Sequence, residues 1–144
     1  MTTSRASAVV VDTMVVSSLL HATRQPVPAA EYRALIDDRP VVVSFATVTE
    51  LRYGALKAGW GELRRRSLER DLARLVIVQP DDALMAVCAE LRAQCEMSGH
   101  GLGQKIHEAD RWIAATAIRL DAALVSDDTV FGDVPGLDVI SRAT

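Results

Sequence analysis

Acidic residues follow two apolar runs of this sequence, at positions where carboxylates can do chemistry. Asp12 comes directly after Ala8–Val11, and Asp127 and Asp128 come shortly after Ala122–Val125. A carboxylate beside buried structure is unfavourable unless it has a partner, a bound metal ion, or a place at the edge of the core. If these acids meet, their mutual repulsion must be resolved by a proton or a cation. The acids therefore indicate a candidate site for a divalent cation.

Two further acids are predicted to face the same region. Asp110 lies in the first turn of the predicted helix Glu108–Leu120 and shares a face with the apolar residues three, four, seven and eight positions on. That face must pack on the rest of the fold, so Asp110 should point inward, whereas Arg111 and Trp112 fall on other faces. Glu50 follows a second apolar run and begins another helical pattern.

Each acid also has a purely structural explanation. Thr47 and Glu50 have the spacing of a capping box, in which the glutamate bonds the backbone N–H of the capping residue. Asp12 suits a turn or a helix N-cap, and Asp110 suits the first turn of a helix through the helix dipole. The acidic pair after the later run suits a turn. The residue types alone leave both kinds of explanation open.

The elements that must position these acids alternate along the chain. Apolar, β-branched runs predict five strands: Ala8–Val11, Val41–Phe45, Leu75–Val78, Ala122–Val125 and Leu137–Ile140. Helical patterns lie between them: Val15–Ala22, Ala29–Asp38, Val48–Ala58, Glu62–Ala73, Asp82–Met97 and Glu108–Leu120. The alternation predicts an α/β fold in one domain, residues 1–144, with a central, mostly parallel five-stranded sheet flanked by helices. Ligand sites in such sheets lie beyond the carboxyl ends of strands where the strand order reverses.

Composition restricts the class of partner. The net charge is −3, so no general attraction draws the chain to a polyanion, and contact with nucleic acid must be local. Arg64, Arg65 and Arg66 in the segment Glu62–Ala73 are the local candidates for contact with RNA phosphates or with an acidic partner tail. The alternative is a solvated helix face with Glu–Arg pairs.

Cysteine and histidine usage narrows the chemistry. Cys88 and Cys95 share a predicted helix, and their Cα atoms would lie roughly 10.5 Å apart, too far for a disulfide. We interpret them as core residues in a reducing cytoplasm. His21, His100 and His107 have no zinc-ligand spacing and are expected on the surface or in loops, so an all-oxygen site for Mg²⁺ or Mn²⁺ is favoured. No apolar run reaches the length of a membrane span, and no membrane partner is expected.

The order of four motifs resembles that of PIN-domain ribonucleases, most closely the VapC-type toxins of bacterial toxin–antitoxin pairs. The most specific motif is DRWIAATAI at Asp110–Ile118. The others are VVDTMV at Val10–Val15, TVTELRYG at Thr47–Gly54 and LVSDDTVF at Leu124–Phe131. The resemblance covers nearly the whole chain and implies a PIN-like nuclease domain.

The resemblance also implies a set of site residues. Asp12, Asp110 and Asp128 would hold the metal ion, with Glu50 as the fourth catalytic acid. The last motif of the family selects Asp128 rather than Asp127, because the acid follows a Ser or Thr after one intervening residue. Thr13 and Ser126 match hydroxyl residues that support the site. Met14 departs from the family pattern, which often has a small polar residue there, and Asp133 stands where a further acid often follows.

The activity implied is cleavage of RNA by attack of metal-activated water on a phosphodiester, with Mg²⁺ or, alternatively, Mn²⁺. The implied partners are an RNA substrate, a cognate antitoxin protein and a second copy of the chain. The alternatives are a PIN-fold RNA-processing nuclease outside a toxin–antitoxin pair and a non-catalytic PIN-fold binding module. A haloacid-dehalogenase-like phosphatase is excluded because it needs a second Asp where Met14 stands. A phospho-receiver domain is excluded because Leu75–Val78 runs into Gln79 and Pro80 instead of an Asp.

Overall fold

Five short strands form one sheet in the computed structural model, which describes residues 7–142. They are β1 (Val9–Val11), β2 (Val41–Ser44), β3 (Val76–Val78), β4 (Ala123–Val125) and β5 (Val139–Ile140). Their order is β3-β2-β1-β4-β5, and every pair of neighbours is parallel. The predicted α/β architecture is confirmed. The outer ends of the predicted domain, residues 1–6 and 143–144, lie outside the described residues.

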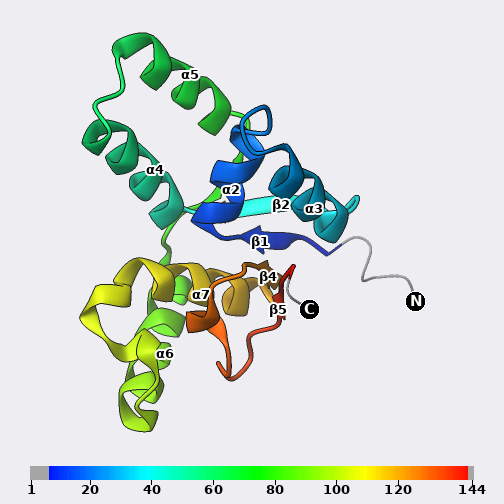
Figure 1. The fold of residues 1–144 in the computed structure, drawn as a ribbon. Coiled ribbons are helices and arrows are strands. Elements are labelled where there is room, and N and C mark those ends of the chain that lie inside the picture. The colour runs from blue at the N-terminus through cyan, green and yellow to red at the C-terminus, as the bar shows by residue number, and fades with distance from the viewer. Residues whose placement is uncertain (1–6, 143–144) are drawn as a thin grey trace.

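Helices cover both faces of the sheet (Figure 1). They are α2 (Thr13–Leu20), α3 (Pro26–Ile36), α4 (Phe45–Lys57), α5 (Glu62–Leu72), α6 (Asp82–Ser98) and α7 (Glu108–Leu120). Three 3₁₀ turns lie in the later loops: η1 (Gly101–Gly103), η2 (Lys105–His107) and η3 (Thr129–Phe131). The helices α2 and α3 pack on one face, and α6 and α7 pack on the other (Figure 1).

The central strand β1 explains why its sequence is a continuous apolar run. Val9 and Val11 pack into the cluster formed with α2 and α3, whereas Val10 packs into the cluster formed with α6 and α7. All three side chains are completely buried. Successive side chains of a strand point to opposite faces, so a strand covered on both faces needs an apolar residue at every position.

The helix α4 begins directly after β2, earlier than the sequence pattern predicts. The helix α4 begins at Phe45, where Ser44 is the N-cap and its hydroxyl accepts a hydrogen bond of 3.1 Å from the backbone N–H of Ala46. The predicted strand Val41–Phe45 therefore ends one residue early. The predicted capping box of Thr47 and Glu50 is wrong, because Thr47 lies inside the helix and not at its N-cap.

The helices α4 and α5 form an arm that extends away from the sheet (Figure 1). The arm has a small apolar cluster of its own, made of Val48, Ala55, Leu68 and Leu72. Arg52 on α4 bonds Glu69 on α5 through two hydrogen bonds of 2.7 and 3.0 Å. The two helices are thus held to each other by both apolar packing and a bidentate ion pair.

The prediction that the cysteines are unpaired core residues is confirmed: Cys88 and Cys95 are free and buried in α6. Burial raises the pKa of both thiols. Within residues 7–142, no helix is both long enough and apolar enough to cross a membrane.

Candidate active site

The acidic residues gather at the carboxyl ends of β1 and β4. These strands are direct neighbours, and the order of the sheet reverses here, with β2 and β3 on one side and β5 on the other. The backbone N–H of Asp12 donates to the carbonyl of Val125 over 3.1 Å, so the residue after β1 is fixed against the end of β4. This is the place where parallel α/β sheets bind ligands.

Asp12 is buried and held on both carboxylate oxygens. Its exposed fraction is 5%. Oδ2 accepts a hydrogen bond of 2.7 Å from the hydroxyl of Ser126, and Oδ1 accepts one of 2.7 Å from the backbone N–H of Thr13. Asp12 is also the N-cap of α2, so its role as a helix cap is compatible with a role in the site.

The electrostatics of Asp12 place two other acids near it. Burial raises the pKa of Asp12 from 3.8 to about 6, against the lowering effect of its hydrogen bonds with Ser126 and Thr13. The negative charges of Asp110 and Asp128 are smaller causes of the same rise. Asp110 and Asp128 therefore each lie within electrostatic reach of Asp12.

Glu50 joins the site through Thr13. The hydroxyl of Thr13 donates a hydrogen bond of 2.6 Å to Oε1 of Glu50 and lies 3.0 Å from the hydroxyl of Thr47. Because the backbone N–H of Thr13 bonds Asp12, one residue connects the carboxylates of Asp12 and Glu50. Thr47 is fully buried, which fixes this contact from the α4 side.

Asp110 lies in the first turn of α7 and contacts a histidine. The Nδ1–H of His107 donates a hydrogen bond of 2.9 Å to Oδ2 of Asp110, and both side chains are about three-quarters buried, with exposed fractions of 31% and 23%. Sequence reasoning expected His107 to be only a surface or loop residue and missed this contact. The spacing of three positions between His107 and Asp110, at the start of a predicted helix, was the signal that could have revealed it.

The pair Asp127 and Asp128 divides between two tasks. Oδ2 of Asp127 accepts hydrogen bonds from Tyr32 and Arg142, and its Oδ1 accepts bonds from Ser141 and the Arg142 backbone. These contacts tie the C-terminal segment to α3. Asp128 is exposed, its backbone N–H donates to Ser126, and its Oδ1 accepts from Val130. Asp127 is therefore committed to contacts with α3 and the C-terminal segment, whereas the charge of Asp128 acts on Asp12.

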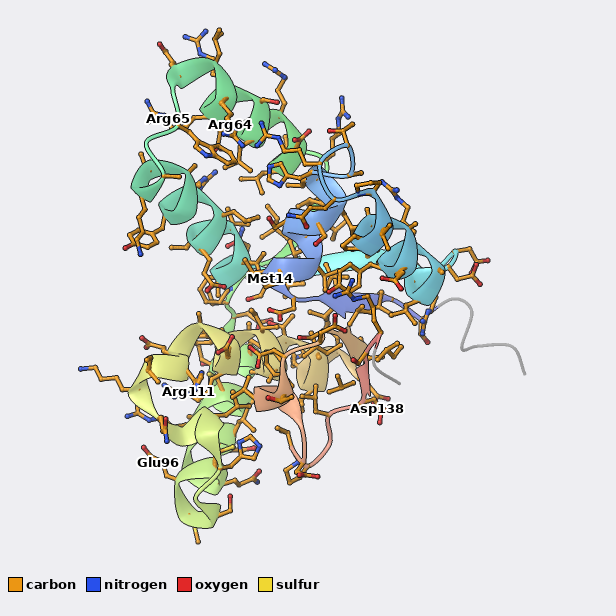
Figure 2. The ribbon with its side chains drawn as sticks, viewed as in Figure 1. Met14, Arg64, Arg65, Glu96, Arg111 and Asp138 are labelled. Carbon is orange, nitrogen blue, oxygen red and sulfur yellow. The ribbon has the colours of Figure 1, made fainter. Side chains whose placement is uncertain are left out.

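The arginines of α5 lie far from the acids. Figure 2 shows Arg64 and Arg65 on the arm. Met14, two positions after Asp12, lies well away from both arginines in the same view. The guanidinium of Arg64 lies 3.7 Å from the ring centroid of Trp60, and Arg66 pairs with Glu62 over 2.7 Å. The expected Glu–Arg pairing is present at Arg66. Any contact that these arginines make with RNA or a partner is remote from the acidic centre.

Arg111 lies on another face of α7 from Asp110, as expected, but it is almost completely buried. Its exposed fraction is 3%. The Nη1 atom donates hydrogen bonds of 2.9 Å to the carbonyl of Leu102 and 2.7 Å to that of Gln104. Arg111 therefore holds the loop that precedes α7. The neighbouring Trp112 packs edge-on against Phe45, with ring centroids 5.1 Å apart.

The acids surround the end of the sheet without already forming a closed set of metal ligands. Over residues 7–142, no three side chains of the His, Cys, Asp or Glu type are gathered tightly enough to hold an ion. At this edge the charges of Asp110 and Asp128 nevertheless both act on the buried carboxylate of Asp12.

Comparison with known proteins identifies the family. The PIN domain model matches residues 9–137, and the chain belongs to the PIN domain family. No curated protein matches the chain. The resemblance drawn from the four sequence motifs is thereby confirmed at the level of the family.

Solved structures similar to this chain include members of the VapBC family of toxin–antitoxin systems. VapBC2 from Rickettsia felis, bound to a DNA fragment from its promoter, matches with a TM-score of 0.75 and 23% identity over 93% of this chain and 98% of that chain. VapBC-1 from nontypeable Haemophilus influenzae matches with a TM-score of 0.73 and 23% identity over 95% and 99% of the two chains. VapBC-5 from Mycobacterium tuberculosis matches with a TM-score of 0.68 and 26% identity over 94% and 98%.

Proposed function

We propose that this protein is a metal-dependent endoribonuclease and the toxin of a toxin–antitoxin pair. The observation that carries the proposal is the buried carboxylate of Asp12, whose pKa is raised by burial and then by the charges of Asp110 and Asp128. These acids lie at the ligand-binding edge of a PIN domain. The toxin assignment is supported by the likeness to VapBC structures along more than nine-tenths of each chain.

The residues at this edge suit Mg²⁺ or Mn²⁺. Asp12, Asp110 and Asp128 would hold the ion, since these hard cations prefer carboxylate oxygens. The raised pKa of Asp12 supports this assignment, because a nearby cation would relieve both the desolvation and the repulsion that raise it. When bound, the ion activates water and stabilises negative charge on the phosphodiester.

The protein's own groups prepare the acids for that role. The hydroxyl of Ser126 and the backbone N–H of Thr13 fix the orientation of the Asp12 carboxylate. The hydroxyl of Thr13 fixes Oε1 of Glu50. The other oxygen, Oε2, would then accept a proton or a hydrogen bond from the attacking water. We therefore assign Asp12, Asp110 and Asp128 to metal binding and Glu50 to proton acceptance. Thr13 and Ser126 are assigned to positioning.

The partners in this proposal are RNA, a second copy of the chain and an antitoxin. An antitoxin peptide with an Arg side chain suits the acidic edge, because a guanidinium binds carboxylates bidentately and remains charged. The groove between α4 and α5 suits the apolar part of such a peptide. Its volume is about 380 Å³, and Ala55, Leu56 and Leu68 line it. A cytoplasmic location belongs to the same proposal and is supported by the free, buried cysteines.

Expression in a bacterial host tests the toxin role. The wild-type chain should arrest growth, and co-expression of the small protein encoded beside it should restore growth. The Asp110→Asn variant should be harmless at the same protein level. Growth arrest by Asp110→Asn equal to that of the wild type would overturn the proposal, because the toxicity would not come from the acidic site. RNA cleavage in vitro without growth arrest would place the protein among PIN-fold nucleases outside toxin–antitoxin pairs.

A further inference from the structure

The carboxylate of Asp110 depends on a single side chain for its orientation. Among residues 7–142, the hydrogen bond that it accepts comes from His107, whose Nδ1 lies 2.9 Å from Oδ2. Asp12, by contrast, is held by both the hydroxyl of Ser126 and the backbone N–H of Thr13. The structure therefore contains one donor that can set the direction of the Asp110 carboxylate, and this donor lies outside the family motifs quoted above.

His107 does not serve the helix as a conventional cap. It occupies the N-cap position of α7, but its backbone has φ −100° and ψ 26°, and its side chain makes no cap hydrogen bond. A capping side chain reaches the free N–H groups of a helix from an extended backbone. The imidazole is therefore committed to Asp110 rather than to the helix backbone.

The loop that carries His107 is fixed in place. Arg111 bonds the carbonyls of Leu102 and Gln104, and Leu102 is completely buried. Gly103 packs so closely on α6 that an added Cβ would lie 2.8 Å from the backbone nitrogen of Glu96. Figure 2 shows Arg111 among these elements, between α7 and α6. The short turn that carries His107, η2, therefore starts from a packed segment at residues 102–104.

We propose that His107 is a positioning residue for the metal site. Its Nδ1–H holds Oδ2 of Asp110, so that Oδ1 remains available for the cation. The inference rests on the proposed function, in which Asp110 is a metal ligand. Hydrogen bonds to ligating groups commonly change metal affinity by about 10- to 100-fold when they are removed.

Two substitutions separate the hydrogen bond from the bulk of the side chain. His107→Phe keeps a ring of similar size and removes the donor, whereas His107→Asn keeps a donor near the position of Nδ1. His21→Phe is the matched control, because the Nδ1 of His21 bonds the carbonyl of Ser17 within its own helix. Asp110→Asn is the reference for loss of the ligand itself.

Isothermal titration of the full-length, metal-free protein with Mn²⁺ alone is the test. We expect Kd to rise by about 10-fold in His107→Phe, to return most of the way in His107→Asn, and to stay unchanged in His21→Phe. Thermal melts of the metal-free variants accompany the titration. Equal Mn²⁺ affinity of His107→Phe and the wild type would overturn the inference, as would equal losses in His107→Phe and His107→Asn.

The failure of the inference can be told from the failure of the proposed function. If Asp110→Asn loses Mn²⁺ affinity while His107→Phe retains it, only the role of His107 is wrong. If Asp110→Asn binds Mn²⁺ as tightly as the wild type, the assignment of Asp110 as a ligand is wrong. Should His107→Phe not fold, His107→Ala takes its place in the same comparison with His107→Asn, and the same two outcomes decide.

Discussion

The hydroxyl of Ser126 donates a hydrogen bond of 2.7 Å to the carboxylate of Asp12, which lies 114 positions away in the chain. The contact forms because β4 pairs directly with β1. The same hydroxyl accepts a hydrogen bond of 3.0 Å from the backbone N–H of Asp128. One serine therefore joins the end of the first strand to the segment that carries another acid of the site.

The raised pKa of Asp12 predicts how pH changes the stability of the metal-free protein. The folded state binds this proton more tightly than the unfolded chain, because the pKa rises from 3.8 to about 6 on folding, chiefly through burial. Protonated Asp12 therefore stabilises the folded state fully below about pH 4, and this stabilisation is lost as the pH rises through about 6. The free energy of unfolding should thus fall by on the order of 3 kcal/mol from this group between low and high pH.

Metal-free Asp12→Asn should therefore be more stable than the metal-free wild type at pH 8, with the difference disappearing near pH 4. Urea unfolding at the two pH values measures it. Added Mn²⁺ should stabilise the wild type by about 2.7 kcal/mol at one hundred times Kd and Asp12→Asn hardly at all. A wild type that is the more stable of the two at pH 8 without metal would contradict the account of Asp12.

Glu50→Gln tests whether Glu50 acts as a charged group. The amide keeps the shape of the side chain, and its carbonyl can still accept the hydrogen bond from Thr13. The helix should be unaffected, because Ser44 and not Thr47 caps it. We expect RNA cleavage to fall by at least about 100-fold if Glu50 accepts a proton, with the melting temperature unchanged. Cleavage at the wild-type rate would remove Glu50 from the catalytic set.

Tyr32→Phe tests the contacts that tie the C-terminal segment to α3. The hydroxyl of Tyr32 donates a hydrogen bond of 2.8 Å to Asp127. Burial and this bond raise the pKa of Tyr32 to about 12. Loss of a hydrogen bond to a charged group should lower the free energy of unfolding by about 1.5–3 kcal/mol at neutral pH. Tyr53→Phe is the control, since Tyr53 is 62% exposed, and it should change little.

The same contact predicts an acid dependence. Burial alone would raise the pKa of Asp127, but the hydrogen bonds from Arg142, Tyr32 and Ser141 outweigh it and hold the pKa at about 2. The stabilisation from Asp127 is therefore complete above about pH 4 and is lost as the pH falls toward 2. Chemical unfolding between pH 4 and pH 2 should show that the loss of unfolding free energy caused by Tyr32→Phe becomes smaller as the pH falls. A loss that stays constant down to pH 2 would mean that the Asp127 charge is not involved.

Gly103→Ala tests the packing of the loop that precedes α7. An added Cβ would lie 2.8 Å from the backbone nitrogen of Glu96, and backbone cannot yield as a flexible side chain does. Overpacking of this kind should cost about 1–3 kcal/mol of stability. At Gly101, in the same turn, a Cβ would meet a Val130 methyl at an ordinary 3.6 Å, so Gly101→Ala is the matched control. Equal melting temperatures of the two variants would contradict the close approach at Gly103.

The sheet and the meeting of Asp12 with the segment after β4 could be predicted from the sequence, because both follow from short-range patterns. The continuous apolar runs indicate strands buried on both faces, and parallel strands bring their following residues, such as Asp12 and Ser126, to one edge. The start of α4 could not be predicted well. Ser44 and Thr47 are both good N-cap residues, and the choice between them is made by where the short strand β2 stops.

The finer division of the site depends on tertiary contacts. Asp127 and Asp128 are equivalent by type, and what separates them is the reach of Tyr32 and Arg142 from distant parts of the chain. His107 has the spacing of three positions to Asp110 that could have indicated the contact, but it precedes the helix, and the backbone there is set by the 3₁₀ turn that leads into α7.

The most direct test of the central claim is RNA cleavage by the purified, metal-free protein. Mixed RNAs are incubated with and without Mg²⁺, and the cut positions are mapped for the wild type and for Asp12→Asn, Asp110→Asn and Asp128→Asn. We predict discrete internal cuts by the wild type with Mg²⁺, no cuts without the ion, and none by the three variants, whose circular dichroism should match that of the wild type. Cleavage by Asp110→Asn at the wild-type rate would contradict the account. So would the absence of cleavage by the wild type with either Mg²⁺ or Mn²⁺.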